Sequence, residues 1–204
     1  HFDALLAALR APSCQVRELW LGGCDWPEGR ALSELVDALP ARGLKVLDVA
    51  GMQLGGALPA ALFEKCADAE VVMLVQMALT GSIPTSVGKC TKAKELMLYT
   101  NQLEGSIPEE IGECASIEDL SLSRNRLTGP VPSSLGKCTK LTNLSLDTNQ
   151  LEGAVPASEL AKLTKLEKLS LHQNEGLTIT ASGKQEIERA APNAEFSWPR
   201  VVDA

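Results

Sequence analysis

The stretch from Leu127 to Gly153 reads LTGPVPSSLGKCTKLTNLSLDTNQLEG, and it ends almost as it begins. The phrase NRLTG, which contains Leu127, returns as NQLEG around Leu151, 24 residues later. Self-similarity at a fixed period of this length indicates a repeat architecture, in which each unit adds one supersecondary element to a stack.

The repeat extends in both directions along the chain. Its pattern is L-x-x-L-x-L-x-x-N-x-L-x-G-x-I-P, and the alternation of apolar and polar residues in its first half predicts a short strand. One such strand cannot bury its leucines alone, so stacked units are expected to form a parallel sheet over a continuous aliphatic core. The units start at Val16, Leu44, Ala69, Ala93, Ile117, Leu141 and Leu166, with successive spacings of 28, 25, 24, 24, 24 and 25 residues.

These units resemble the leucine-rich repeat family over nearly the whole chain. Within that family, LTGSIPTSVG (79–88), LEGSIPEEIG (103–112) and LTGPVPSSLG (127–136) are similar to the plant-type repeat LxxLxLxxNxLxGxIPxxLGxC. The first unit is longer, has Cys24 at the asparagine position and continues into the helix-like ALSELVDAL (31–39), so it resembles the ribonuclease-inhibitor type. The resemblance implies an α/β solenoid: a leucine-rich-repeat superhelix with a concave parallel β-sheet, about seven repeats and helical caps at both ends.

The expected organisation is a single solenoid domain over residues 1–204. Residues 1–15 are interpreted as an N-terminal helical cap or the edge of a lost repeat, residues 16–178 as the repeats, and residues 179–204 as a C-terminal cap. Terminal units need such covers because one face of their core would otherwise meet water. In the C-terminal cap, the residues expected to point inward or to shield the last strand are Ile187, Ala190, Ala191, Phe196 and Trp198.

The amino-acid composition limits which classes of molecule are expected to bind the chain. The chain has 204 residues, is 45% hydrophobic but only 3% aromatic, and carries a formal net charge of −7. A nucleic-acid-binding domain would present a basic face, so nucleic acid is not expected as a partner. No run of 18 or more apolar residues is present, and therefore no transmembrane segment is expected.

Four of the six cysteines recur every 24 residues in a slot that Leu163 fills in a later unit. A slot that accepts leucine is a core position, so these cysteines are expected to be small buried hydrophobic residues rather than disulfide or metal sites. The four are Cys66, Cys90, Cys114 and Cys138.

The two remaining cysteines bear on the cellular compartment. Extracellular relatives of the plant type usually carry paired cysteines in an N-terminal cap, and Cys14 and Cys24 are too isolated to form that pair. This favours an intracellular reducing compartment, either the cytoplasm or an organelle reached after removal of a targeting peptide, over an extracellular location.

No catalytic constellation is recognisable, so the chain is expected not to be an enzyme and to need neither a cofactor nor a metal. GPVPSSLGKC has the wrong glycine spacing for a phosphate loop and has Cys138 where a magnesium-binding hydroxyl belongs. His172 and Asp147 occupy matching strand slots but lack a positioned nucleophile. The glycosylation signal Asn143-Leu144-Ser145 matters only in a secreted protein.

The strand residues between the leucines remain free to vary, because they face outward on the concave sheet. In the later units these positions hold mainly serine, aspartate and asparagine, whereas the earlier units carry a set of valines, methionines and aromatic residues. A contiguous apolar patch rich in methionine and aromatic residues indicates a protein-binding site. If the register of the early units were shifted by one residue, the same side chains would belong to the core. The predicted partner-binding residues are Trp20, Val46, Val71, Met73, Val75, Met97 and Tyr99.

The favoured function is a non-catalytic protein–protein interaction module that binds a protein partner through its concave face. Two alternatives remain open. One is a fixed structural or scaffold subunit of a larger multiprotein assembly, which the N-terminal edge favours. The other is an extracellular receptor-like or defence ectodomain, which the plant-type repeats support and the missing cysteine cap opposes.

Overall fold

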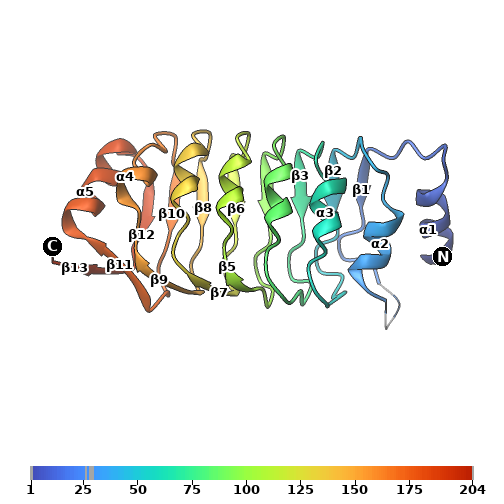
Figure 1. The fold of residues 1–204 in the computed structure, drawn as a ribbon, viewed down its shortest axis with the longest axis horizontal. Coiled ribbons are helices and arrows are strands. Elements are labelled where there is room, and N and C mark those ends of the chain that lie inside the picture. Colours follow the sequence, from blue (N-terminus) through green and yellow to red (C-terminus); the bar gives the residue numbers. More distant parts are fainter. Residues whose placement is uncertain (1, 26, 28–29, 204) are drawn as a thin grey trace.

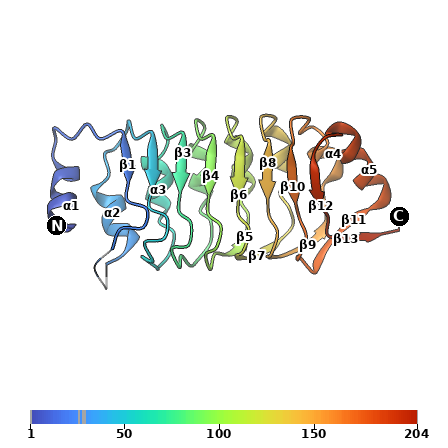
Figure 2. The same cartoon turned by 180° about the vertical axis from the view of Figure 1, so that it is seen from behind.

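The computed structural model describes residues 2–25, 27 and 30–203, and in it the chain winds through a row of similar coils (Figure 1). Each coil contributes one short strand to a long parallel sheet, which is seen face-on in Figure 2. Within the described residues this sheet has eight strands in the order β1-β2-β3-β4-β6-β8-β10-β12. Their bounds are β1 (Glu18–Trp20), β2 (Val46–Asp48), β3 (Val71–Met73), β4 (Glu95–Met97), β6 (Asp119–Ser121), β8 (Asn143–Ser145), β10 (Lys168–Ser170) and β12 (Glu195–Ser197).

The middle residue of each repeat strand points into the core, as the alternating pattern predicts. Leu47, Leu96 and Leu144, for example, are fully buried, and each such leucine contributes roughly 1.5–3 kcal/mol through removal of apolar surface from water. Strand pairing preserves the repeat period, since Leu47 lies opposite Val72 and Leu96 lies opposite Leu120. The register deduced from the sequence is therefore confirmed in the early units as well as the later ones.

A second parallel sheet runs along the L-x-G-x-I-P segments, and the sequence pattern does not predict it. These segments are extended and recur at a fixed spacing, so their backbones align: the Arg126 N–H donates to the Leu103 carbonyl at 2.8 Å. The glycine of the motif has a positive φ, 74° at Gly105 and 72° at Gly129, which other residues adopt only with strain. Its five described strands are β5 (Glu104–Ser106), β7 (Arg126–Gly129), β9 (Gln150–Ala154), β11 (Gly176–Thr180) and β13 (Arg200–Val202).

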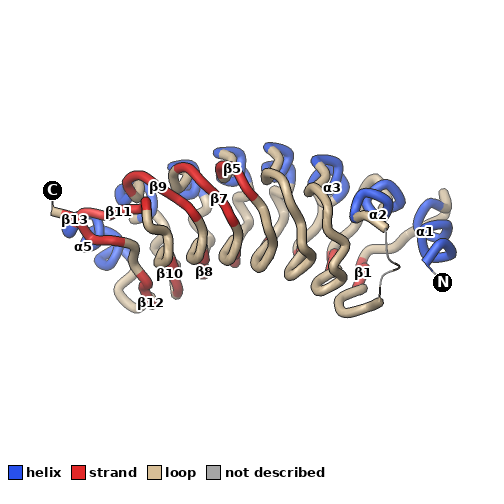
Figure 3. Tube along the Cα trace, turned by 90° about the horizontal axis from the view of Figure 1, so that it is seen from below, coloured by secondary structure: helices blue, strands red, loops and turns tan. Residues whose placement is uncertain are grey.

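Helical segments line the outer, convex side of the curved solenoid, opposite the long sheet (Figure 3). Several begin directly after the proline of the I-P motif or its equivalent, whose fixed φ suits a helix start; Pro84 and Pro108 precede two of them. The three units that contain residues 79–88, 103–112 and 127–136 have 3₁₀ helices here, whereas the first two units and the unit that starts at Leu141 have α-helices. The helical segments are α1 (Phe2–Arg10), α2 (Leu32–Ala38), α3 (Ala60–Lys65), η1 (Thr85–Lys89), η2 (Glu109–Glu113), η3 (Ser133–Lys137), α4 (Ala157–Leu160) and α5 (Ala181–Ala190).

The N-terminal helix α1 packs beside α2 at the first edge of the solenoid. Arg30 joins the two helices: its guanidinium contacts Asp3 at 2.7 Å and Glu34 at 2.6 Å, and it lies 4.9 Å from the centre of the Phe2 ring. The helix-like sequence patterns at 2–10 and 31–39 are thus found as helices. The wider division of the chain into caps and repeats stays a prediction.

The C-terminal segment contains more than the closing helix that its sequence suggests. Ile187 and Ala191 are buried, and Ala190 is half-buried. Beyond the helix, β12 adds one more strand to the long sheet, and Phe196 lies opposite Leu169 of β10. The Phe196 and Trp198 rings stack with centroids 4.9 Å apart and pack against the core, and Phe196 also extends the sheet as part of β12.

Candidate binding surface

The outward-facing residues of the long sheet form regular columns across the repeats. Strand pairing sets Val46 beside Val71 and Glu95 beside Asp119 in the first column. The column between the two strand leucines changes character halfway along the sheet, from tryptophan and methionine, interrupted by Asp48, to serines. In order, this column contains Trp20, Asp48, Met73, Met97, Ser121, Ser145 and Ser170.

The seven predicted partner-binding residues all lie on this face, but they are not equally open to solvent. Trp20 is 58% exposed, and Val46, Val71, Met73 and Tyr99 are half-buried. The prediction that all seven face solvent is wrong for the other two: Val75 and Met97 retain only 8% and 9% exposure.

Lateral packing explains the low exposure of Val75 and Met97. Neighbouring strands lie about 4.8 Å apart, so a side chain in the middle of the sheet is covered by the equivalent residues on both sides. Met97 is flanked in this way by Met73 and Ser121, whereas Trp20 on the edge strand has a described sheet neighbour, Asp48, on one side. Val75 and Met97 are not members of the leucine core cluster, so they form the floor of the concave surface.

An asparagine ladder closes the turn after each later strand. The Asn101 Oδ1 accepts the N–H groups of Met77 at 3.0 Å and Leu79 at 3.1 Å, while its Nδ2 donates to the Leu74 and Leu98 carbonyls. In the earlier units Met52 and Met77 replace the asparagine and are buried, 4% and 0% exposed. The ladder therefore begins at Asn101, in the last repeat of the apolar half, one repeat before the serines begin at Ser121.

Acidic groups mark the boundary between the apolar and polar halves. Glu95 and Asp119 lie side by side in the first column, and Asn143 follows, donating from Nδ2 to Asp119 Oδ2 at 3.2 Å. Partial burial raises the pKa of Asp119, and the hydrogen bond from Asn143 and the charge of Lys168 oppose that rise. Two neighbouring carboxylates repel each other, so this boundary favours a basic group on any partner.

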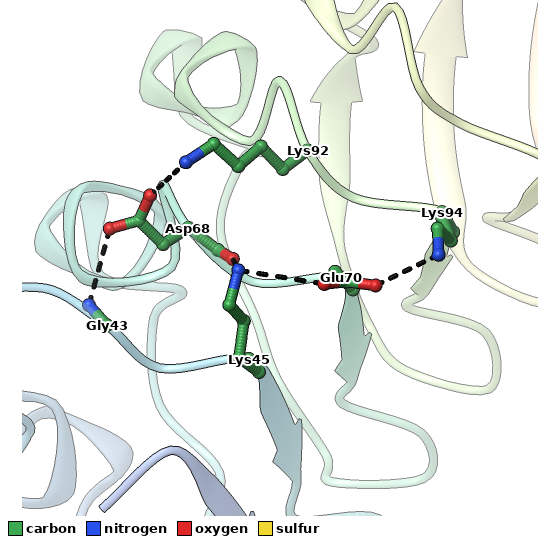
Figure 4. Close-up of polar contacts among 6 residues, drawn as sticks. All are labelled: Gly43, Lys45, Asp68, Glu70, Lys92 and Lys94. Carbon is green, nitrogen blue, oxygen red and sulfur yellow. Dashed lines mark hydrogen bonds and ion pairs between the residues drawn. The ribbon is translucent and has the colours of Figure 1, made fainter. Parts of the chain in front are cut away.

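A ladder of alternating charges runs immediately beside the apolar half (Figure 4). Glu70 lies between Lys45, at 3.6 Å, and Lys94, at 2.9 Å, and the hydrogen bond from Lys94 is the main reason that the pKa of Glu70 is lowered. Asp68 accepts from Lys92 and from the Gly43 N–H, which lower its pKa in the same way. Exposed pairs of this kind add little stability, so their effect is to give the apolar surface a charged rim.

The groups considered for catalysis or metal binding do not assemble into a recognisable site. His172 is half-buried beside Asp147, and its Nδ1 makes no hydrogen bond within the structure. Within the described residues, no group of three or more His, Cys, Asp or Glu side chains is placed to hold a metal ion. Across the same residues, no helix is both long enough and apolar enough to cross a membrane.

The cysteine column is buried, as its shared slot with Leu163 predicts. All six cysteines are free; Cys24 is exposed and Cys14 is half-buried. Burial raises the pKa of the thiols of Cys66, Cys90 and Cys114 to about 12 and that of Cys138 to about 11. Only the thiolate is nucleophilic, so these four groups are shielded both sterically and by their protonation.

We expect thiol titration with a chromogenic disulfide reagent at pH 8 to detect Cys24 rapidly and the four column cysteines only after denaturation. Because the folded pKa values lie above the ordinary thiol value, the folded state retains protons that the unfolded state releases as the pH rises. The stability that these thiols confer is therefore complete below about pH 8 and declines on the way to pH 12. Rapid reaction of all six thiols in the native protein would contradict the burial of the column.

Comparisons with known proteins support this architecture. The sequence profile of the Leucine Rich Repeat family matches residues 116–138. No curated protein matches the chain. The solved LRR ectodomain of the Arabidopsis receptor kinase HAESA, in complex with an N-terminally extended IDA peptide hormone ligand, is 27% identical with a TM-score of 0.74, and the match covers 90% of this chain and 30% of that one.

Two further Arabidopsis thaliana structures are similar. The LRR ectodomain of the membrane receptor kinase GASSHO1/SCHENGEN3, in complex with CASPARIAN STRIP INTEGRITY FACTOR 2, is 26% identical with a TM-score of 0.69 over 94% of this chain and 25% of that one. A chain of the BIR3–SERK2 complex is 34% identical with a TM-score of 0.55 over 64% of this chain and 68% of that one. This chain thus spans less than a third of the length of the larger receptor ectodomains.

These comparisons overturn the expectation of an intracellular reducing compartment. The similar solved structures are ectodomains of plant membrane receptors, which lie outside the cell. The expectation rested on the missing cysteine pair at the N-terminal end. That signal was misleading because the repeats are held together by leucine packing and the asparagine ladder, which need no disulfide in either compartment.

Proposed function

The chain belongs to the leucine-rich repeat family, with plant-type repeats, and from that premise we propose that it is an extracellular, receptor-like module that binds a peptide or protein through the apolar half of its concave sheet. The proposal takes the receptor-ectodomain alternative over the intracellular one. The observation that carries it is the run of accessible apolar side chains on the concave face of a fold shared with peptide-binding receptor ectodomains.

The proposed contact surface has an open edge and a packed floor. Trp20 stands at the edge, and Val71, Met73 and Tyr99 provide half-buried surface between the strands. Aromatic and methionine side chains are enriched at the centres of interfaces. The Trp20 and Tyr99 rings are rigid and lose little conformational freedom on binding, whereas the flexible Met73 side chain can adapt its shape to the partner. Val75 and Met97 pack beneath these residues, and they are expected to affect binding mainly through the shape of the contact surface.

The chemistry of the partner follows from the groups around this surface. The carboxylates of Glu95 and Asp119 lie at one end of it, and the Lys45–Glu70–Lys94 ladder flanks one side. A segment with an apolar side chain next to a basic one would bury the first against Met73 and neutralise the second at Glu95, on the adjacent strand. HAESA and GASSHO1 are solved with peptide or protein ligands, which is the class of partner proposed here.

A triple variant tests the surface: Val71→Thr, Met73→Gln and Tyr99→Ser. These changes remove accessible apolar surface and leave the core leucines untouched, so the variant is expected to keep its circular dichroism spectrum and to lose binding about tenfold or more. Binding is measured by cross-linking capture, with mass spectrometry, from the extracellular fluid of the tissue that produces the chain.

The matched control changes three residues on the polar half, Ser123→Ala, Asp147→Asn and Lys168→Gln, and is expected to bind as the wild type does. If the apolar variant stays folded and retains the same ligand while the control loses it, the contact surface lies on the polar half instead. Recovery of the native protein only from the cytosol, and not from the extracellular fluid, would refute the proposed location.

A further inference from the structure

Asn143 differs from every other asparagine in the chain. It is the only one followed by the x-Ser/Thr pattern that glycosylation requires, in Asn143-Leu144-Ser145. The ladder asparagine Asn149 is buried, and its amide serves the backbone on both sides. Asn143 instead lies half-buried on the concave face of β8, where its Nδ2 donates to Asp119 at 3.2 Å.

We propose that Asn143 is an N-glycosylation site, and that its glycan stands over the polar half of the concave sheet. The proposal rests on the extracellular function proposed above, because the glycosyl donor is found only in the secretory pathway. Nδ2 of Asn143 attacks the anomeric carbon of a lipid-linked diphosphate oligosaccharide. The new N–C bond replaces the C–O bond to the diphosphate, which leaves with the bonding electrons, and the amide nitrogen loses one proton.

The place of Asn143 in the fold determines whether glycosylation comes before or after the repeats stack. In the folded chain β8 is held between β6 and β10, and the Asn143 N–H donates to the Glu118 carbonyl at 3.1 Å. An acceptor segment must reach an enzyme active site, so transfer precedes the stacking of this repeat onto its neighbours. The glycosylated amide still has one N–H, which retains a donor for the hydrogen bond to Asp119.

On the folded surface the Asn143 side chain lies between Asp119 and Lys168 in its own column. The next column contains the small side chains of Ser121, Ser145 and Ser170. Of these, Ser145 is half-buried and its hydroxyl offers a donor and an acceptor to a saccharide, whereas Ser121 and Ser170 are only 8% and 4% exposed. A glycan there covers part of the serine-rich half of the concave face and starts two strands away from Met97.

To test the proposal, the full chain is expressed in plant cells with an added N-terminal secretion signal. Its purification tag carries a second N-glycosylation sequence as an internal control. Glycopeptide mass spectrometry is expected to find an N-linked glycan on Asn143 as well as on the tag. The Asn143→Gln and Ser145→Ala variants should each lose only the glycan on Asn143. Ser145→Ala is the sharper variant, since it leaves the Asn143 amide and its bond to Asp119 in place.

Ser170→Ala is the matched control, because Ser170 lies opposite Ser145 in the next repeat but belongs to no acceptor sequence. This variant is expected to keep the glycan on Asn143. An unmodified Asn143 peptide from protein whose tag carries a glycan would overturn the proposal. The added signal makes this outcome independent of natural export and of partner binding, so failure of the proposed function leaves the result unchanged.

Discussion

Replacing Gly112 with alanine is expected to lower the free energy of unfolding by about 3 kcal/mol, through overpacking of the convex side. A Cβ at this position would lie 2.5 Å from the Ser134 carbonyl oxygen and 2.6 Å from the Ser134 Cβ, distances that real structures do not tolerate. Ser134 cannot easily move aside, because its hydroxyl donates to the Glu109 carbonyl at 2.6 Å and its N–H donates to the Glu109 carboxylate at 2.9 Å. Chemical denaturation followed by circular dichroism measures the loss.

The same slot holds Gly88 and Gly136, whose added Cβ atoms would approach the Glu110 and Glu159 carbonyl oxygens at 2.8 and 2.7 Å. Close stacking of each 3₁₀ helix on the helical segment of the next repeat therefore accounts for the glycine in these three units. Gly22→Ala is the control, because its nearest neighbours are the carboxylate atoms of Asp48, the end of a flexible side chain that gives up the hydrogen bond from the Ala50 N–H if it turns away. Its expected cost is about 1 kcal/mol. Equal losses at Gly22 and Gly112 would contradict the close-packing explanation.

Replacing Asn125 with alanine is expected to cost about 3 kcal/mol, because it leaves a buried N–H without an acceptor. The Asn125 Oδ1 accepts the Leu103 N–H at 3.0 Å, and its Nδ2 donates to the Leu98 and Leu122 carbonyls at 3.0 Å each. One side chain thus links two consecutive repeats. The measurement is the same denaturation experiment, made on protein produced in bacteria so that glycosylation does not intervene.

Asn143→Ala provides the comparison for the ladder. Asn143 makes a single side-chain hydrogen bond at a half-buried position, so its loss is expected to cost less than about 1 kcal/mol. If Asn125→Ala proved as mild as Asn143→Ala, the ladder would be dispensable and leucine packing alone would hold the repeats in register. Such a result would also mean that asparagine at this position stabilises the fold no more than the methionines Met52 and Met77 do at the equivalent positions.

Several features could be read from the sequence because they depend on local periodicity. Alternation of period two determines which strand residues face the core, and the constant repeat length determines which residues are neighbours across strands. The pairing of Met73 with Met97, and of Asp119 with Asn143, therefore follows from counting. The burial of the cysteine column followed from the same alignment, since Leu163 shares its slot.

Other features escaped the sequence because they depend on how the repeats stack. Gly105 and Gly129 indicated a turn or an extended segment, but pairing into a second sheet requires several such segments to lie side by side. Phe196 and Trp198 were expected only to shield the last strand, yet their segment forms β12, because the terminal coil still has an open sheet edge to complete. The expected cellular compartment was also wrong. It rested on the absence of one cysteine pair, which is weaker evidence than the fold that the chain shares with extracellular receptor ectodomains.

The sequence by itself determined the repeat, the register and the division of the concave face into apolar and polar halves, because each depends on spacing along the chain. Tertiary structure alone decided how much of that face is open. Met97 and Trp20 belong to one column, but two flanking strands cover Met97 while Trp20 stands at the sheet edge. The exposed fraction of a side chain depends on which residues surround it in space, and these residues come together only when the repeats stack.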